Sequence, residues 1–344
     1  MKHRSSPAAL RARALDLGPY LGERLGGEVQ VAAVSLASQG MSATTLLLEL
    51  ADGREIVIRG QETAKTNKGD QDGNEVQFHI LRAAAKARVP APPALFCEPD
   101  PDMLGVPFLA TERLPGHAVV PWSREGHAIL TEAGRGPAGD QLLDILVAIH
   151  KVPTDDEDLV RAFGAPPKSS TGDALDRLQA SIDGSKHGVE EPILADALGW
   201  LRMHLRECSD PTLVHGDFRA GNLLFDDGRI SGVLDWEFAH VGDPARDVAW
   251  LMAKSNRVSE DLACDMVPLN EVLDRYRRAG GRDIDPAAIA YWDVFMLVWT
   301  TAIWLRTTAS WRAGALNDIR IARWTYALPG LRLMILDALE GVSR

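Results

Sequence analysis

Residues 213–243 read LVHGDFRAGNLLFDDGRISGVLDWEFAHVGD, and this stretch limits how the chain can fold more than any other. Its two apolar runs, LLF and ISGVL, are separated by Asp-Asp-Gly at 226–228, a sequence typical of a tight β-hairpin turn. A hairpin brings the residues before its first strand close to those after its second. The sequence therefore predicts that Asp217 and Asn222 lie beside Asp235.

Such a cluster would offer oxygen ligands from two carboxylates and an amide. Oxygen ligands suit Mg²⁺, which is usually held by one or two carboxylates together with the phosphates of a substrate. Zinc would require Cys or several His ligands, and only His215 and His240 lie near in the sequence. A magnesium ion with a bound nucleotide is therefore the site that these residues favour.

Length and charge narrow the class of protein. The chain has 344 residues, more than one hydrophobic core usually covers, which favours two lobes. Hydrophobic residues make up 46% and charged residues 25%, as in ordinary globular proteins. The formal net charge of −11 disfavours binding to nucleic acid or to an anionic membrane, because both rely on clustered Lys and Arg. We therefore expect a small molecule as partner; the oligomeric state is left open.

Several features favour a cytoplasmic protein. The three cysteines are far apart and lack metal-ligand spacing, which indicates reduced thiols. The N-terminal segment lacks the apolar run of a secretory signal and is typical of one amphipathic helix. Residues 287–305 are long enough to cross a membrane, but Asp293 within them would cost about 2.5–3.5 kcal/mol near the bilayer centre. We therefore expect a buried core helix there.

The first part of the chain predicts an antiparallel sheet with one helix. Three β-rich runs, VQVAAVSLAS, ATTLLLEL and REIVIRG, are followed by the helical pattern NEVQFHILRAAAKARV and by two more extended runs before Pro115-Gly116. Asp52-Gly53 predicts a hairpin turn between the second and third runs. We place the boundary between lobes here, with residues 1–114 in the first lobe and 115–344 in the second. The second is mainly helical, and its acidic run 155–158 is expected to be a solvated loop.

The motifs H-G-D-F-R-A-G-N and L-D-W-E, with Asp235 thirteen residues after Asn222, resemble the catalytic and metal loops of the aminoglycoside phosphotransferase-like family. G-D-P-x-x-D follows at Gly242–Asp247, where that family has it. The resemblance covers most of the chain, although the first lobe matches only in outline. It implies an α+β, bilobal, protein-kinase-like fold with a small antiparallel-sheet lobe and a larger helical lobe, and the activity of a small-molecule kinase.

The resemblance assigns roles to the loop residues. Asp217 would act as the catalytic base for the acceptor hydroxyl, and Asn222 and Asp235 would hold Mg²⁺ on the nucleotide phosphates. Arg219 would either contact the transferring phosphoryl group or form a surface salt bridge. His215 would brace the loop. Two further acids follow. Asp247 would anchor loop amides from a buried position, and Glu237 would either reach the metal through water or, as we expect, be exposed.

In the first lobe, kinases pair a strand Lys with a helix Glu to hold the nucleotide phosphates. Here the strand offers Arg59 and the following helix offers Glu75, so the expected ion pair joins these two residues. Two lysines in the polar loop before the helix, Lys65 and Lys68, are alternatives to Arg59. The phosphate-covering loop would be formed around one glycine, Gly40, with the Ser42 hydroxyl as a donor.

Two further expectations follow from the resemblance. Backbone groups between Glu112 and Leu114 would meet the base of ATP, with GTP as a possible replacement. Gly216 stands where many regulated protein kinases have an Arg that clasps a phosphorylated loop. We therefore expect activity without prior phosphorylation.

The acceptor is predicted to be a hydroxylated small metabolite. An aminoglycoside or other cationic antibiotic is the alternative, but after Arg306 basic residues outnumber acidic ones; they are Arg312, Arg320, Arg323, Arg332 and Arg344 against Asp318, Asp337 and Glu340. Asp293 needs either an amine substrate or an internal Arg, and we favour the Arg. The late tryptophans are expected to be mainly core, with one or two able to stack on an acceptor; they are Trp292, Trp299, Trp304, Trp311 and Trp324. A nucleotide-binding regulator without transfer activity is the alternative function.

Overall fold

The computed structural model describes residues 7–37, 44–60, 73–164, 171–183, 191–316 and 318–342. Contacts between Cα atoms divide the chain into two units. The first contains Met1–His117, Val152–Pro167 and Leu223–Glu237, and the second contains Ala118–Lys151, Lys168–Asn222 and Phe238–Arg344. Each unit mixes helices with antiparallel strands, so the fold is α+β, as predicted.

The first unit is built on a five-stranded antiparallel sheet with the strand order β1-β2-β3-β5-β4. The strands are β1 (Val31–Leu36), β2 (Thr44–Leu50), β3 (Glu55–Gly60), β4 (Ala94–Glu98) and β5 (Phe108–Glu112). All five predicted runs thus form strands of one sheet. The Asp52-Gly53 turn is also confirmed, because Gly53 has a φ of 87° and its N–H donates to the Leu50 carbonyl at 3.0 Å.

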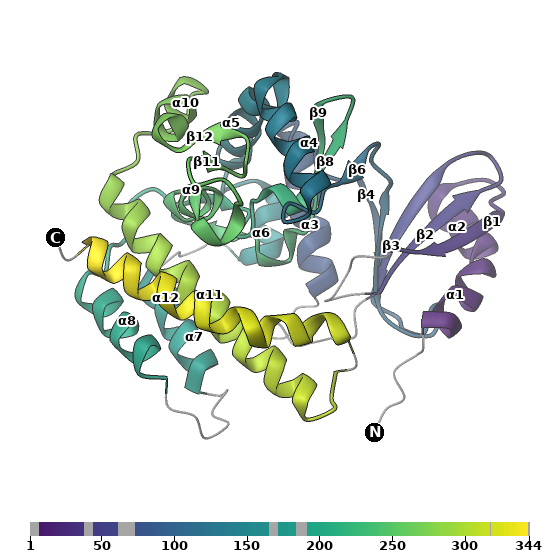
Figure 1. Ribbon diagram of the computed structural model, residues 1–344. Helices are drawn as coiled ribbons and strands as arrows, with labels where there is room; N and C mark the ends of the chain where they lie inside the picture. Colours follow the sequence, from purple (N-terminus) through teal and green to yellow (C-terminus); the bar gives the residue numbers. More distant parts are fainter. Residues whose placement is uncertain are drawn as a thin grey trace. The chain divides into compact units, whose positions relative to one another are not determined.

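Two helices, and not the one predicted, precede this sheet: α1 (Pro7–Leu15) and α2 (Gly18–Leu25). Pro19 in the first turn of α2 starts a new helix, because proline is tolerated there and not in a helix interior. Leu10 and Leu21, one from each helix, are almost fully buried in the core that also holds Leu46 and Ile58 of the sheet. Figure 1 shows α1 and α2, in purple, beside β1 and β2.

Helix α3 (Gly73–Lys86) packs against α6 (Glu157–Phe163), and this contact corrects the expectation of a solvated loop at residues 155–158. Asp156 caps α6 by accepting from the Asp158 N–H at 2.9 Å. The Asp158 side chain is fully buried and ion-paired to Lys86 at 2.9 Å, Arg82 at 3.2 Å and His79 at 2.8 Å. The cations on α3 explain why an acidic run is not simply exposed here.

The predicted hairpin at the motif is confirmed. Strands β8 (Leu223–Asp226) and β9 (Arg229–Val233) pair in antiparallel fashion within the first unit. Asp227 and Gly228 both have positive φ angles, 46° and 71°, as a two-residue type I′ turn requires.

The second unit is mainly helical. Its helices are α4 (Arg124–Arg135), α5 (Pro137–His150), α7 (Thr171–Asp183), α8 (Pro192–Met203), α9 (Ala245–Met252), α10 (Val272–Arg278), α11 (Pro286–Arg312) and α12 (Ala322–Val342). The unit also contains two short antiparallel strand pairs. In one, β7 (Thr212–Val214) pairs with β10 (His240–Gly242); in the other, β11 (Leu262–Ala263) pairs with β12 (Val267–Pro268). A further short strand, β6 (His117–Ala118), lies at the boundary of the two units.

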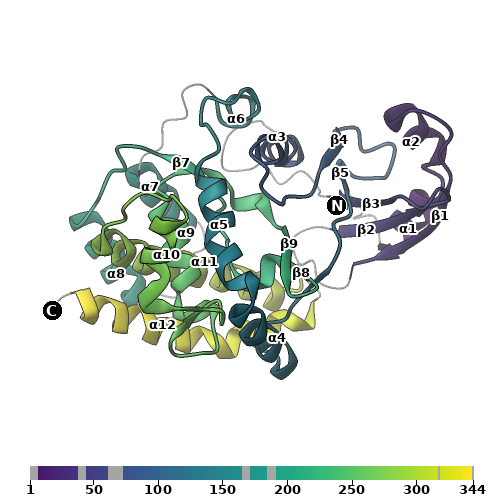
Figure 2. The same cartoon turned by 90° about the horizontal axis from the view of Figure 1, so that it is seen from above.

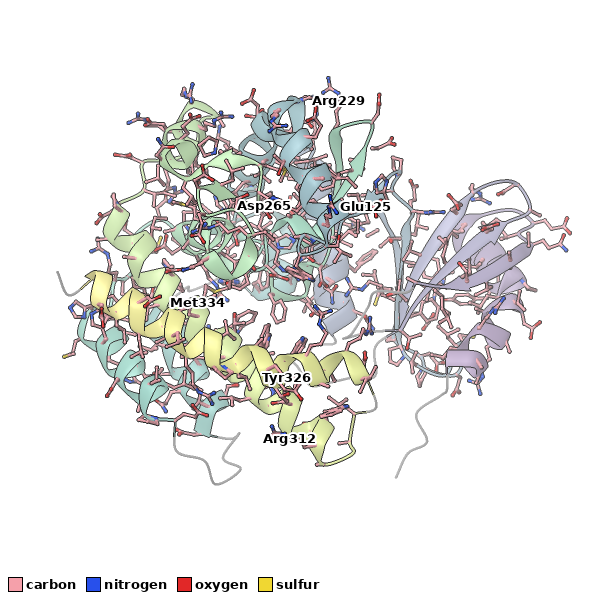
Figure 3. The ribbon with its side chains drawn as sticks, in the orientation of Figure 1. Glu125, Arg229, Asp265, Arg312, Tyr326 and Met334 are labelled. Atoms are coloured by element: carbon pink, nitrogen blue, oxygen red, sulfur yellow. The ribbon has the colours of Figure 1, made fainter. Side chains whose placement is uncertain are left out.

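Helix α11 contains the segment predicted to be a core helix. By length and composition it could cross a membrane, but 56% of its most apolar stretch is buried inside the protein, and core helices commonly pass the same test. It packs against α8, α9 and α12, and Figure 2 shows these helices grouped together. In Figure 3, Arg312 lies at the end of α11 and the exposed Tyr326 on α12. The helix is therefore part of the packing of the second unit.

Candidate active site

The loop after β7 is anchored by one buried acid. The N–H groups of His215 and Gly216 donate to the two carboxylate oxygens of Asp247 at 2.7 and 2.8 Å. Gly216 has a φ of 82°, and a Cβ at this position would lie 2.4 Å from the Phe238 carbonyl oxygen. Only glycine fits both constraints without strain. The predicted anchoring role of Asp247 is thus confirmed.

Asp247 lies on α9 and is fully buried. Burial favours its neutral form, but hydrogen bonds from His150 and from the His215 amide favour the carboxylate, and together they hold its pKa below the usual value. His150 Nε2 lies 3.2 Å from Asp247, and His150 Nδ1 lies 2.7 Å from the Tyr276 hydroxyl. A buried chain of polar groups therefore runs from α10 through α5 to the loop.

Asp217 is oriented by three donors from the second unit. Trp250 Nε1 donates to its Oδ1 at 2.7 Å, Arg219 Nε donates to the same oxygen at 3.0 Å, and Asn222 Nδ2 donates to its Oδ2 at 2.7 Å. Its own N–H donates to His215 Nδ1 at 3.2 Å, so His215 braces the loop as predicted. Of the two roles left open for Arg219, the structure contains the salt bridge, with Asp217 as its partner.

The Asn222 side chain is fixed by hydrogen bonds to Asp217. Its Nδ2 donates both to the Asp217 side chain and to the Asp217 carbonyl, at 2.7 and 2.9 Å. The amide oxygen therefore points elsewhere and keeps its lone pairs for another partner. Among the described residues no group of three or more His, Cys, Asp or Glu side chains could hold a metal ion. Any metal bound here would need the amide oxygen, carboxylate oxygens and phosphate, a set that suits Mg²⁺.

Asp235 belongs to the first unit, directly after the hairpin. It has a φ of 67°, a left-handed conformation that is uncommon for residues other than glycine and is often found at functional sites. Its Oδ1 accepts from Arg59 Nη2 at 3.0 Å, and Glu237 lies 4.0 Å from the same nitrogen. Glu237, expected to be exposed, is largely buried, with 17% of its side chain accessible.

The predicted ion pair between Arg59 and Glu75 is not formed. Glu75 is exposed in the first turn of α3, where the helix dipole favours an acid, and Arg59 is paired with Asp235. Glu112 and Leu114 lie at the end of β5 and just beyond it, with Glu112 exposed. Four predicted residues lie outside the described part of the chain; they are Gly40, Ser42, Lys65 and Lys68.

The comparison with known proteins decides the family. Residues 33–292, more than half of the chain, match the phosphotransferase enzyme family (APH). The chain belongs to this family.

Two curated relatives extend the match. Mouse acyl-CoA dehydrogenase family member 10 is 33% identical over 217 residues, 61% of this chain and 19% of the relative. Rat acyl-CoA dehydrogenase family member 11 is 26% identical over 306 residues, 82% of this chain and 37% of the relative. The chain thus spans only about a fifth to a third of the length of these relatives. A shorter match, 42% identical over 57 residues, joins it to hygromycin-B 4-O-kinase of Escherichia coli, covering 16% of this chain and 17% of that kinase.

Solved structures of family members share the fold. A Ralstonia eutropha protein assigned to the aminoglycoside phosphotransferases is 19% identical and superposes with a TM-score of 0.71, covering 98% of this chain and 99% of that one. An aminoglycoside phosphotransferase APH(4)-Ia variant, solved with ADP and hygromycin B, is 18% identical with a TM-score of 0.61 over 94% and 98% of the two chains. At these identities the likeness establishes the bilobal, kinase-like fold alone.

Three further residues of the candidate site carry little or no sequence signal. Trp250 is one of them, because an aromatic residue in an apolar helix usually fills space. His150 ends a helix far from the motif, and no local pattern connects it to Asp247. Arg246 stands inside the G-D-P-x-x-D motif at a position that the motif leaves open. The last of these could have been noticed, because a charged residue next to the buried Asp247 needs an explanation.

Asp293 does not find the arginine partner that was favoured. Burial raises its pKa to about 6, and the charge of Arg257 opposes this only in part. No hydrogen bond or ion pair joins Asp293 to any described residue. The Arg257 guanidinium donates instead to the backbone carbonyls of Met252, Ser259 and Glu260.

Proposed function

We propose that this protein transfers the γ-phosphoryl group of ATP, or of GTP in its place, to a hydroxyl group of a small molecule. The hydroxyl oxygen forms a bond to the γ-phosphorus, the bond from phosphorus to the β,γ-bridging oxygen breaks, and the nucleoside diphosphate leaves. The observation that carries the proposal is the fixed carboxylate of Asp217, held by Trp250 and Asn222 on a loop pinned to Asp247.

Asp217 is proposed as the catalytic base. Its carboxylate is oriented by donors on both oxygens, so its remaining lone pairs point in fixed directions. A carboxylate in that state can accept the proton of the acceptor hydroxyl as the oxygen attacks phosphorus. Arg219, bonded to the same carboxylate, is proposed to contact phosphoryl oxygens with its remaining donors.

Asn222 and Asp235 are proposed as the protein ligands of Mg²⁺. The metal, when bound, would neutralise the charge of the phosphates. Both residues offer hard oxygen atoms, and the amide nitrogen of Asn222 is already occupied by Asp217. Arg59 is bonded to Asp235, so a phosphate group held by Arg59 would lie next to this ligand.

By resemblance we also propose that Gly40 and Ser42 contact the nucleotide phosphates and that the backbone between Glu112 and Leu114 contacts the base. Related phosphotransferases have been solved with ADP and with GDP, which supports use of either nucleotide.

The acceptor we propose is a hydroxylated metabolite that carries a carboxyl or acyl group. The excess of arginine over acids near the C-terminus would suit an anionic molecule. The two curated relatives are named for dehydrogenases of acyl-CoA, which supports an acyl compound. Aminoglycosides are the alternative, because solved relatives bind hygromycin B and kanamycin. We propose a cytoplasmic protein, in keeping with its three free thiols.

The test is a transfer assay with a matched variant. Purified protein, ATP and Mg²⁺ are incubated with hydroxy acids, hydroxyacyl-CoA thioesters, hygromycin B and kanamycin, and phosphorylated products are detected by ³¹P NMR. Asp217→Asn should reduce kcat by about 10²–10⁴-fold while calorimetry detects unchanged nucleotide binding. Asp226→Asn, which alters an exposed acid of the hairpin, serves as control. Nucleotide binding without transfer to any acceptor would favour the regulator instead.

A further inference from the structure

Arg246 on α9 is a buried cation to which none of the described acids is hydrogen-bonded or ion-paired. Only 7% of its surface is exposed, and its Cζ lies over three aromatic rings of α11, at 5.7 Å from Trp292, 5.4 Å from Phe295 and 5.8 Å from Trp299. A guanidinium group has five N–H donors. Within the described part of the chain, Nη1 lies 3.2 Å from His240 Nε2, and Nε has no hydrogen-bond partner.

The nearby acids are committed elsewhere. Asp247 accepts from His150 and from two loop amides, and Asp217 accepts from Trp250, Arg219 and Asn222, so neither accepts a hydrogen bond from Arg246. Burial lowers the pKa of Arg246 to about 10, with Asp247 opposing the shift, so the guanidinium is still charged at neutral pH.

A second positive charge adds to the first. Arg177, on α7, is close enough to help lower the pKa of Arg246. Among the described residues it has neither a hydrogen bond nor an ion pair. Arg246 thus has the charges of Asp247, Asp217 and Arg177 nearby, but none of the described acids forms a hydrogen bond with its guanidinium, which leaves N–H donors for a bound anion.

The unmatched charge lies close to the proposed base. Arg246 and Trp250 are four residues apart on α9, hence on one face and about 6 Å apart along the helix axis. Trp250 Nε1 donates to Asp217 at 2.7 Å, and the ring of Trp299 lies 6.4 Å from that of Trp250. Arg246 therefore lies one helical turn from the tryptophan that orients Asp217.

We propose that Arg246, assisted by Arg177, binds a carboxylate of the acceptor and thereby selects hydroxy acids over neutral alcohols. This inference rests on the proposed function for the role of Asp217. The guanidinium supplies paired N–H donors that match a carboxylate, and the surrounding rings keep water away and strengthen the attraction. Arg246 is therefore a specificity residue of the acceptor site.

The experiment compares hydroxy carboxylates of three to eight carbons with the primary amides of the same compounds. Two properties are measured: KM in the transfer assay, and the change in tryptophan fluorescence on binding without nucleotide, because Trp292 and Trp299 flank the guanidinium. The variants are Arg246→Met, Arg246→Lys and Arg177→Met. Arg275→Met is the control, since Arg275 is an arginine of α10 that pairs with Glu271 and Asp140.

The wild-type protein should prefer carboxylates to amides at least tenfold. Arg246→Met should remove this preference by weakening binding of the carboxylate alone, Arg246→Lys should restore part of it, and Arg177→Met should reduce it less. An equal preference in wild type and Arg246→Met, or a loss of stability as the only effect, would overturn the inference.

The two proposals fail in different ways. A fluorescence response to carboxylates that depends on Arg246, without any phosphoryl transfer, would keep the anion site and refute the kinase. Transfer to neutral alcohols as fast as to hydroxy acids would keep the kinase and refute the anion site.

Discussion

Asp158 in the first unit and Arg246 in the second are both buried charges, but among the described residues only Asp158 is in direct contact with side chains of opposite charge. Asp158 is in contact with Lys86, Arg82 and His79, whereas Arg246 has aromatic rings and one histidine around it. The comparison indicates that a buried charge with a purely structural role, such as Asp158, is ion-paired with other residues of the same chain. Arg246 lacks such an ion pair and lies near the oriented carboxylate of Asp217, and we explain its burial by a ligand that it binds.

The largest effect should follow from removing the acid that anchors the catalytic loop. Asp247→Ala leaves His150 and the amides of His215 and Gly216 without their acceptor, and loss of one partner from such a buried network costs about 3–5 kcal/mol. Urea unfolding measures the change. A loss below about 1 kcal/mol would show that the loop is held by other contacts.

Asp158→Asn tests the neutralised charge. Burial would raise the pKa of Asp158, but hydrogen bonds from Lys86 and His79 lower it to about 2. The folded-state pKa is thus depressed, so the ion pairs stabilise the protein above pH 4 by about 2 kcal/mol, and this is lost as the pH falls towards 2. Urea midpoints of wild type and variant should therefore differ at pH 7 and converge with acidification. A pH-independent difference would contradict this.

Asp293→Asn tests an acid with no cation in contact. Its pKa in the folded protein is about 6, above the value of an ordinary Asp, so the native state holds a proton that the unfolded chain releases between about pH 4 and 6. Stability should therefore fall as the pH rises over this range. The variant should be more stable than wild type by about 2–3 kcal/mol at pH 7 and equal to it below pH 4. Thermal unfolding at both pH values gives the answer, with the exposed Asp196→Asn as control. A variant less stable at pH 7 would reveal a partner for the carboxylate.

The smallest effect is expected at an exposed pair. Glu132 and Arg135 lie 3.2 Å apart on α4, with 78% and 72% of their side chains accessible. Glu132→Gln should change the free energy of unfolding by less than about 0.5 kcal/mol, because water screens the charges. A larger change in the free energy of unfolding would show that this exposed ion pair contributes as much to stability as a buried one.

Local patterns predicted most of the fold. Alternating apolar runs gave the five strands, and Asp-Gly pairs gave both hairpin turns. Errors arose where a distant segment supplies the partner. The acidic run 155–158 is partly buried because cations on α3, some seventy residues earlier, cover it.

In the candidate site, too, local sequence indicated the contacts within the motif but not those with distant segments. The roles of Asp247 and His215 could be predicted, because the motif is contiguous and its amides need an acceptor. Trp250 and His150 could not, because their contacts with the motif depend on the packing of helices. The pairing of Arg59 with Asp235 joins residues 176 positions apart, and no local signal distinguishes it from a pair with Glu75.

The backbone at Gly216 has an evolutionary consequence. Many regulated protein kinases carry an arginine at the equivalent position, but here any side chain would meet the Phe238 carbonyl and require a left-handed φ angle. A single substitution therefore cannot install a phosphate-sensing clasp in this loop. A protein with such a clasp would need a rearranged loop as well as the new side chain.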